Sequence, residues 1–141
     1  MASKIRKDHK GPKTLVADKI DSVRNLGLDN HIVFSFIHLS KDQGASFQQW
    51  SEEGKLIPAL ERLKEYSGKK ISQTDSIFTI YGDFPPKTKF RHPKNVPQDA
   101  QWARIHVDGK HVIAGHVVKN IFYVVFLDSD HSFWVTEKKH T

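Results

Sequence analysis

Residues 102–134, WARIHVDGKHVIAGHVVKNIFYVVFLDSDHSFW, decide the fold, because they read as three consecutive antiparallel strands. Asp108-Gly109 lies between two β-rich runs and is typical of a two-residue hairpin turn, which needs positive φ at both central positions. Lys119-Asn120 marks a second turn, since Asn tolerates the left-handed region. The run 121–127 is apolar throughout, which favours a central strand covered on both sides.

Two-residue turns would fix the register of the three strands. They predict that His106 faces His111, that Arg104 faces Ile113, and that His116 faces Tyr123. Side chains alternate along a strand, so the meander has two faces. On the first, apolar face His116 is the one strongly polar group, and we interpret it as a hydrogen-bonded core residue. The second face mixes aromatic with charged and imidazole groups: Trp102, Arg104, His106, His111, Phe122, Phe126 and Asp128.

The preceding sequence predicts the rest of a single α+β domain over residues 30–136. We expect a strand over 31–39, a helix over 51–67 and a short second helix over 72–81, where Ser72 and Asp75 resemble a capping box. Pro58 either kinks the first helix or lies in its first turn. The predicted fold is an antiparallel β-sheet, made of one N-terminal strand and a three-strand C-terminal meander, with helices packed on one face. Residues 1–13 read as a basic arm, 14–29 as a helix and 137–141 as a tail.

Composition limits the class of protein. The 141 residues include no cysteine, which excludes disulfides and thiolate zinc sites. No apolar stretch has the length of a membrane span, and the N-terminus lacks the apolar region of a signal peptide, so we expect a cytoplasmic protein with no membrane partner. The 22 Lys and Arg residues outnumber the 16 Asp and Glu residues, which favours a nucleic-acid partner over a merely solubilising surface charge.

The proline-rich loop at 85–97 is a candidate nucleic-acid surface, with a solvated surface connection as the alternative. Its cations have no acid among them, and aromatic rings are interleaved with them. The candidate nucleic-acid-binding residues are Lys87, Lys89, Arg91, His92 and Lys94, together with Trp102, whose indole can stack on a base.

Candidate catalytic residues follow from the chemistry of RNA cleavage by its own 2′-OH. This reaction needs a base near the hydroxyl, an acid at the leaving oxygen and cations around the phosphorus. Arg104, His106, His111 and His131 provide these groups, and no cofactor is expected. A metal site of His106, His111 and Asp128 is a weaker alternative, and an ion pair with Asp128 is the structural alternative for Arg104. The chain contains no HExxH, Gly-rich phosphate loop or G-x-S-x-G motif.

Several short sequences carry a resemblance to a known family. They are ALERLKEYS at 59–67, Arg91-His92-Pro93, and NIFYVVFLDSDH at 120–131, in the order strand, two helices, meander. In this respect residues 30–134 resemble the RelE-like toxins and the wider barnase–RelE group of small RNases. The resemblance implies a metal-independent endoribonuclease of a toxin–antitoxin or phage-defence system, in some cases acting on the ribosome, that a cognate antitoxin neutralises. The alternatives are a non-catalytic module that binds RNA, ribosome or protein, and a structural or antitoxin-like partner protein.

Overall fold

The structure is a computed structural model that describes residues 30–135. The chain divides into two compact units, Met1–His31 and Ile32–Thr141, and all the elements below belong to the second. The basic arm predicted at 1–13, the helix predicted at 14–29 and the tail predicted at 137–141 lie outside the described residues. Within residues 30–135, no helix is long and apolar enough to cross a membrane.

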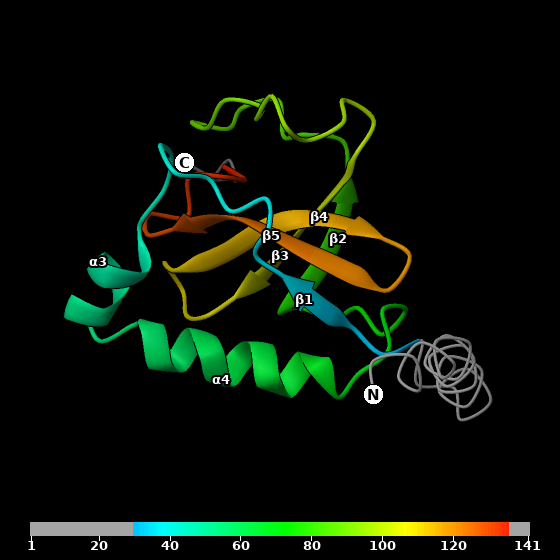
Figure 1. The fold of residues 1–141 in the computed structure, drawn as a ribbon, viewed down its shortest axis with the longest axis horizontal. Coiled ribbons are helices and arrows are strands. Elements are labelled where there is room, and N and C mark those ends of the chain that lie inside the picture. Colours follow the sequence, from blue (N-terminus) through cyan, green and yellow to red (C-terminus); the bar gives the residue numbers. More distant parts are fainter. Residues whose placement is uncertain (1–29, 136–141) are drawn as a thin grey trace, which may run out of the picture. The chain divides into compact units, whose positions relative to one another are not determined.

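The fold is α+β, and residues 30–135 form one five-stranded sheet and two helices (Figure 1). The strand order across the sheet is β1-β5-β4-β3-β2. The strands are β1 (Val33–Ser35), β2 (Phe78–Gly82), β3 (Gln101–His106), β4 (Val112–Val118) and β5 (Ile121–Asp128), and the helices are α3 (Phe47–Glu52) and α4 (Leu56–Ser67).

The predicted three-strand meander is confirmed, but the prediction of a purely antiparallel sheet is wrong. β3, β4 and β5 pair antiparallel in sequence order, as expected. β1 is shorter than the predicted strand and pairs parallel with β5. The parallel pair arises because α3 and α4 carry the chain from β1 to the opposite edge of the sheet, where β2 adds to β3.

β2 replaces the end of the short helix predicted over 72–81. The carboxylate of Asp75 does not cap a helix but accepts hydrogen bonds from the backbone N–H groups of Ile77 and Phe78, at 2.9 and 2.8 Å. The Tyr66 hydroxyl of α4 also donates to it. This turn delivers the β-prone run 77–81 to the edge of β3. The helix prediction failed because a local capping pattern serves here as a turn before a strand.

The register of the meander agrees with the prediction at one turn and differs at the other. Val118 pairs with Ile121 and His116 with Tyr123, as expected. At the Asp108-Gly109 turn, however, His106 pairs with Val112 and not with His111. The loop is longer because Oδ1 of Asp108 accepts hydrogen bonds from the backbone N–H groups of Lys110 and His111, at 2.8 and 2.7 Å. A shift of one residue turns each side chain to the other face.

A bulge between β4 and β5 depends on Gly115. The register shifts between Ala114 and Gly115, so the two strands are offset beyond this point. A Cβ atom at Gly115 would collide with the backbone oxygen of Tyr123 and would lie 2.8 Å from a ring carbon of Phe122. Only glycine therefore permits the close approach of these strands.

The helices cover one face of the sheet. The N-terminus of α3 is closed by a capping box, in which Ser46 and Gln49 exchange side-chain and backbone hydrogen bonds. The single helix predicted over 51–67 is thus two helices, and Pro58 lies in the first turn of α4. Their buried side chains join the sheet in a first core, which includes Trp50, Ala59, Leu63, Tyr66, Phe78, Ile105, Phe122 and Val124.

The opposite face is covered as well, by the loop between β2 and β3 and by the segment after β5 (Figure 1). Phe84, Phe90 and Val96 of that loop pack back onto the sheet, and Lys89 N donates to Ser132 O at 3.1 Å. We expected an open, mixed face here. It is instead largely an aromatic second core, built around Trp102, Val125, Phe126 and Phe133, because the loop supplies enough apolar area to cover it.

Candidate functional site

Alternation along β3 places three side chains on the sheet face that carries the second core. Trp102, Arg104 and His106 share this face, whereas Ala103 and Ile105 belong to the first core. Trp102 is fully buried, while Arg104 and His106 are only partly buried. The aromatic core therefore gives way to polar groups along the strand, toward the C-terminal end of β3.

The turn after β5 brings His131 to His106, with the two ring centroids 5.1 Å apart. His131 has a φ of 53°, a left-handed conformation that non-glycine residues seldom adopt. Its Nδ1 lies 3.1 Å from the carbonyl oxygen of Trp134. A carbonyl only accepts hydrogen bonds, so Nδ1 is the donor and Nε2 is the nitrogen that can exchange a proton with another group.

Asp128 builds the turn that carries His131. Its buried carboxylate accepts hydrogen bonds from the backbone N–H groups of Asp130, Ser132 and Phe133, at 3.2, 3.1 and 2.8 Å. The Ser132 hydroxyl donates a further one at 3.1 Å. These four bonds occupy the carboxylate, and within residues 30–135 it forms no ion pair with Arg104. The alternative of an Arg104–Asp128 ion pair is therefore wrong for this structure.

Tyr81 of β2 completes the group, and its role was not predicted because we expected a helix there. The Arg104 guanidinium carbon lies 5.6 Å from the centre of the Tyr81 ring. That ring stacks on Trp134 at 4.1 Å with an interplanar angle of 8°. The Tyr81 hydroxyl and the Arg104 Nε atom are both buried without a hydrogen-bond partner. A buried polar atom without a hydrogen-bond partner in the protein costs free energy unless a water, an ion or a ligand binds to it.

Two groups of the site, His106 and Tyr81, have pKa values shifted away from their ordinary values. Burial lowers the pKa of His106, and the charge of Arg104 and the neighbouring His131 lower it further. Burial also raises the pKa of Tyr81 to about 12, against the influence of Arg104. At neutral pH His106 is therefore an uncharged base beside a fixed positive charge, and Tyr81 is a neutral hydrogen-bond donor.

His111 does not join this group, contrary to the sequence prediction. Its side chain points to the helix side, where its ring lies edge-on to Trp50 at 5.6 Å. Nδ1 contacts Asp108 at 3.0 Å and Nε2 contacts Glu53 at 3.2 Å. The residue is 7% exposed, and both ring nitrogens are occupied. The one-residue register shift thus makes His111 a structural link between the β3–β4 loop and α3.

Trp102 cannot stack on an RNA base in this structure, so that prediction is also wrong. The indole is 0% exposed and packs against Phe84, His92 and Phe133. It was predicted on the correct face, but the proline-rich loop covers it. Its Nε1 atom is buried without a hydrogen-bond partner.

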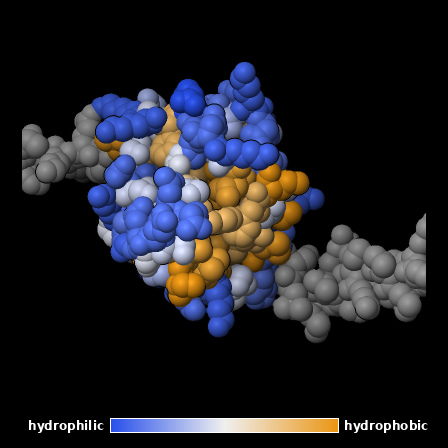
Figure 2. Space-filling model, turned by 60° about the vertical axis from the view of Figure 1, so that its left-hand side comes forward, coloured by the Kyte–Doolittle hydropathy of each residue, from blue (hydrophilic) through white to orange (hydrophobic). Residues whose placement is uncertain are grey.

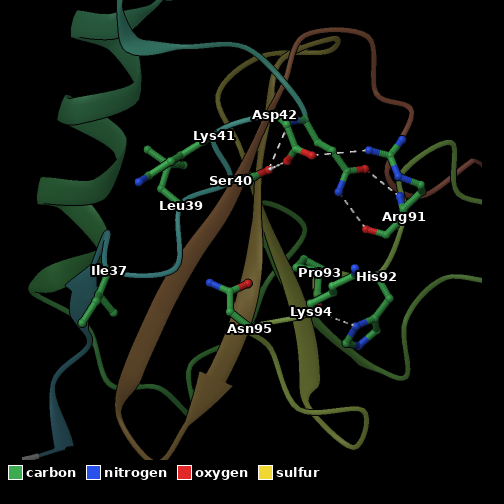
Figure 3. A pocket seen from close by; sticks show the side chains of 11 residues that line it. Ile37, Leu39, Ser40, Lys41, Asp42, Arg91, His92, Pro93, Lys94 and Asn95 are labelled. Carbon is green, nitrogen blue, oxygen red and sulfur yellow. Dashed lines mark hydrogen bonds and ion pairs between the residues drawn. The ribbon is translucent and has the colours of Figure 1, made fainter.

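The basic residues predicted to bind nucleic acid are distributed along the loop over the second core. Arg91, His92 and Lys94 line a cavity of about 690 Å³, the nucleotide-sized cavity, between the 91–95 and 37–43 segments (Figure 3). Lys87 lines a smaller one of about 210 Å³ beside Trp134. Lys89 is fixed through its backbone to Ser132. The structure thus does not gather these residues at one place, since three line one cavity, Lys87 lines the other and Lys89 lines neither of the two.

A second pair of imidazoles, His116 and His38, lies on the same sheet face. The sequence analysis singled out His116 but not His38. His116 is 2% exposed, which confirms the prediction of a buried histidine, but it pairs with Trp102 on the second-core face and not on the first, apolar face, where it was predicted. Its Nε2 lies 3.1 Å from Nδ1 of His38, and both rings stack on Tyr123. Burial lowers the pKa of His116 to about 4, and the charges of His38 and His92 act in the same direction. The contact of His38 with His116 could not be predicted from neighbouring residues, because His38 follows β1 and is far from β4 in sequence.

Metal-ligand geometry is absent from the part of the chain that the structure describes. There, no group of three or more His, Asp or Glu side chains is arranged to hold a metal ion. The alternative site of His106, His111 and Asp128 is wrong, because the two histidines lie on opposite faces and Asp128 is occupied by its own turn. Comparisons of the chain with protein-family models, curated proteins and solved structures found no match.

Proposed function

We propose that this protein is an endoribonuclease of the toxin–antitoxin or phage-defence kind, which cleaves RNA without a metal ion. The observation that carries the proposal is the grouping of Arg104, His106 and His131. Two imidazoles lie 5.1 Å apart beside a guanidinium whose Nε is buried without a partner. These are the groups that cleavage by the 2′-OH requires.

The roles follow from the charges of the site. Neutral His106 accepts the proton of the RNA 2′-OH, whose oxygen attacks the adjacent phosphorus. His131, in its imidazolium form with a proton on each ring nitrogen, donates the Nε2 proton to the departing 5′ oxygen as the P–O5′ bond breaks and is left neutral with Nδ1 still donating to Trp134 O. Arg104 stabilises the negative charge that develops on the phosphoryl oxygens, and the Tyr81 hydroxyl donates to the same group. The products are a 2′,3′-cyclic phosphate and a 5′-hydroxyl end.

Arg104 is the strongest single support for an anionic substrate. Its Nε is a hydrogen-bond donor removed from water and given no acceptor in return, which costs free energy in the absence of a ligand. A phosphate bound by the partly buried guanidinium neutralises its charge.

A non-catalytic module that binds RNA, ribosome or protein is the second candidate. The observation in its favour is that the cations of the 85–97 loop and the nucleotide-sized cavity lie outside the Arg104 group and are able to hold RNA without cutting it. Cleavage assays separate the two functions.

The test is incubation of the pure protein with RNA, with and without EDTA. We expect cleavage in both, with cyclic phosphate ends, and no cleavage where the scissile nucleotide lacks its 2′-OH. Arg104→Ala should lower the rate by about 10²-fold or more without lowering the melting temperature. Lys64→Ala is the matched control, since Lys64 is an exposed cation on α4. Wild-type cleavage by Arg104→Ala protein would overturn the proposal.

A protein partner is part of the same proposal. An apolar area surrounded by hydrophilic residues lies on the face drawn in Figure 2. The exposed large apolar side chains of the described residues include Phe36 and Phe47, whose rings meet edge-on at 5.5 Å. A cognate antitoxin would gain free energy by covering such an area. Phe36→Ser with Phe47→Ser should weaken neutralisation by that antitoxin in cells and leave RNA cleavage by the pure protein unchanged.

A further inference from the structure

We propose that the nucleotide-sized cavity between segments 37–43 and 91–95 binds one nucleotide of an RNA strand and reads its base. The inference rests on the proposed function for the identity of its ligand. The cavity is lined by residues other than those of the Arg104 group, so the base-reading site and the nuclease function are tested by different experiments. The cavity measures about 690 Å³, within the range of small-molecule sites.

The walls of the cavity are held together before any ligand binds. The Gln43 side-chain amide donates to Arg91 O at 3.0 Å and accepts from Arg91 N at 2.7 Å, which fastens one segment to the other. Ser40 N donates to Val125 O at 2.8 Å, which anchors the first segment to β5. Little conformational entropy is lost when a ligand enters a site of this kind.

One side of the cavity suits a base. Ile37 and Leu39 line it, and Ile37 is 76% exposed, a large apolar surface that the fold does not use. The Asn95 amide reaches from the opposite segment into the space before these side chains (Figure 3). Within the described residues this amide has no hydrogen-bond partner, so both its donor and its acceptor are free to pair with the edge of a base.

The charged residues that line the cavity suit a phosphate. Lys41, Arg91 and Lys94 line the cavity, against a single acid, Asp42. Asp42 lies 3.6 Å from Arg91, and the side chains are 77% and 74% exposed respectively, so this ion pair is weak. Within residues 30–135 neither lysine forms an ion pair. An apolar wall, a free amide and unpaired cations together fit a nucleotide better than an inorganic anion.

The cavity also lies on the sheet face of the Arg104 group. His92 lines the cavity, and its ring contacts Trp102 at 5.6 Å, two residues before Arg104 on β3. Its Nδ1 donates to Pro93 O at 2.9 Å, which leaves Nε2 as a buried acceptor without a partner. Trp102 and Arg104 are separated by about 7 Å along the strand.

Titration of the labelled full-length protein with the four ribonucleoside 5′-monophosphates and with inorganic phosphate tests the inference by NMR. At least one nucleotide should bind on the order of tenfold more tightly than phosphate and should shift the Asn95 side-chain amide signals. Asn95→Ala should reduce the differences among the four nucleotides. Ile37→Ser should weaken the binding of all four nucleotides but not of phosphate.

Matched controls are available for each change. Val33→Ser removes an exposed apolar side chain of β1 outside the cavity, and Lys64→Gln removes a cation from α4, so neither should alter binding. Lys94→Gln should weaken nucleotides and phosphate alike. Equal affinity for nucleotides and phosphate, or shifts confined to residues outside the cavity, would overturn the inference.

The experiments distinguish a failure of the proposed nuclease function from a failure of the proposed base-reading cavity. Arg104→Ala should lower the rate of cleavage by about 10²-fold or more and leave the binding of mononucleotides to the cavity intact. Nucleotide binding without RNA cleavage by the wild-type protein would support the cavity and overturn the nuclease. RNA cleavage with no nucleotide bound in the cavity would support the nuclease and overturn the base-reading site.

Discussion

At the scale of single residues, the polar atoms that the fold leaves unsatisfied are concentrated on one sheet face. Among the described residues, the buried side-chain atoms without partners include Tyr81 Oη, Arg104 Nε, His92 Nε2, Trp102 Nε1 and His116 Nδ1. All five belong to the face opposite the helices. Within the described residues none of these atoms has a hydrogen-bond partner, so each needs a bound water or a ligand to offset the cost of its desolvation. These five atoms are the reason, at the level of single residues, to search for a ligand on this face.

Tyr81→Phe separates function from stability at this scale. The hydroxyl is buried and unpartnered, so removing it should leave the melting temperature equal to or above that of the wild type. If the hydroxyl donates to the phosphoryl group, the rate of RNA cleavage should fall by about tenfold or more. Thermal unfolding and cleavage are measured on the same sample, and a lower melting temperature with an unchanged rate would contradict the assignment.

His116 predicts a pH dependence of stability. Burial holds its pKa at about 4 in the folded protein, below the ordinary value of 6.5. The unfolded chain therefore binds more protons over this interval, and the free energy of unfolding should fall as the pH is lowered from about 6.5 to 4, by at most roughly 3 kcal/mol. His116→Gln should lose this component, which urea unfolding at several pH values measures. An identical pH profile in the variant would show that another group is responsible.

At the scale of elements, the bulge at Gly115 is the most sensitive point of the sheet. Gly115→Ala places a methyl group against the backbone of β5 and should lower the free energy of unfolding by more than about 2 kcal/mol. Gly109→Ala is the control, because nothing lies within 4 Å of a Cβ atom there, and it should change stability by less than about 0.5 kcal/mol. Equal effects of the two substitutions would contradict this account of the bulge.

The proline-rich loop predicts the salt dependence of RNA binding. Neutralising Lys87, Lys89, Arg91 and Lys94 together should weaken binding and flatten the slope of log affinity against log salt concentration, because fewer counterions are released. The slope should fall by about 0.7 for each phosphate of a single strand that the protein no longer neutralises. Fluorescence anisotropy over a salt series measures it, and the quadruple variant must retain the wild-type melting temperature. An unchanged slope would exclude the loop as a phosphate-binding surface.

The elements that the sequence predicts well are those whose pattern of apolar and turn residues lies within the element itself. Continuous apolar β-prone runs and turn residues are enough to predict the β3–β5 meander and the Lys119-Asn120 register. The Asp108 turn was mispredicted because the Asp108 side chain bonds to its own backbone and lengthens the loop. β2 was missed because its turn is closed by Tyr66, nine residues away on α4.

At the scale of the whole molecule, the candidate site is predictable in part. Arg104, His106 and His131 were identified together, since two lie in one strand and the third follows the meander. Tyr81 and His38 were not, because they approach from β2 and from the segment after β1 through tertiary pairing alone. His111 was included wrongly, through a single error of register.

The parallel pairing of β1 with β5 has a consequence for how the protein is made. The first strand of the described unit pairs with the last, Val33 with Ile121, so β1 has no partner strand in this unit until β5 has been synthesised. Such a high contact order slows folding and delays it until late in the translation of the unit. His131 lies beyond β5, so the imidazole pair also forms late. A shorter nascent chain on the ribosome would therefore carry no assembled site, and under the nuclease function proposed above it would not be able to cleave its own messenger before that site has formed.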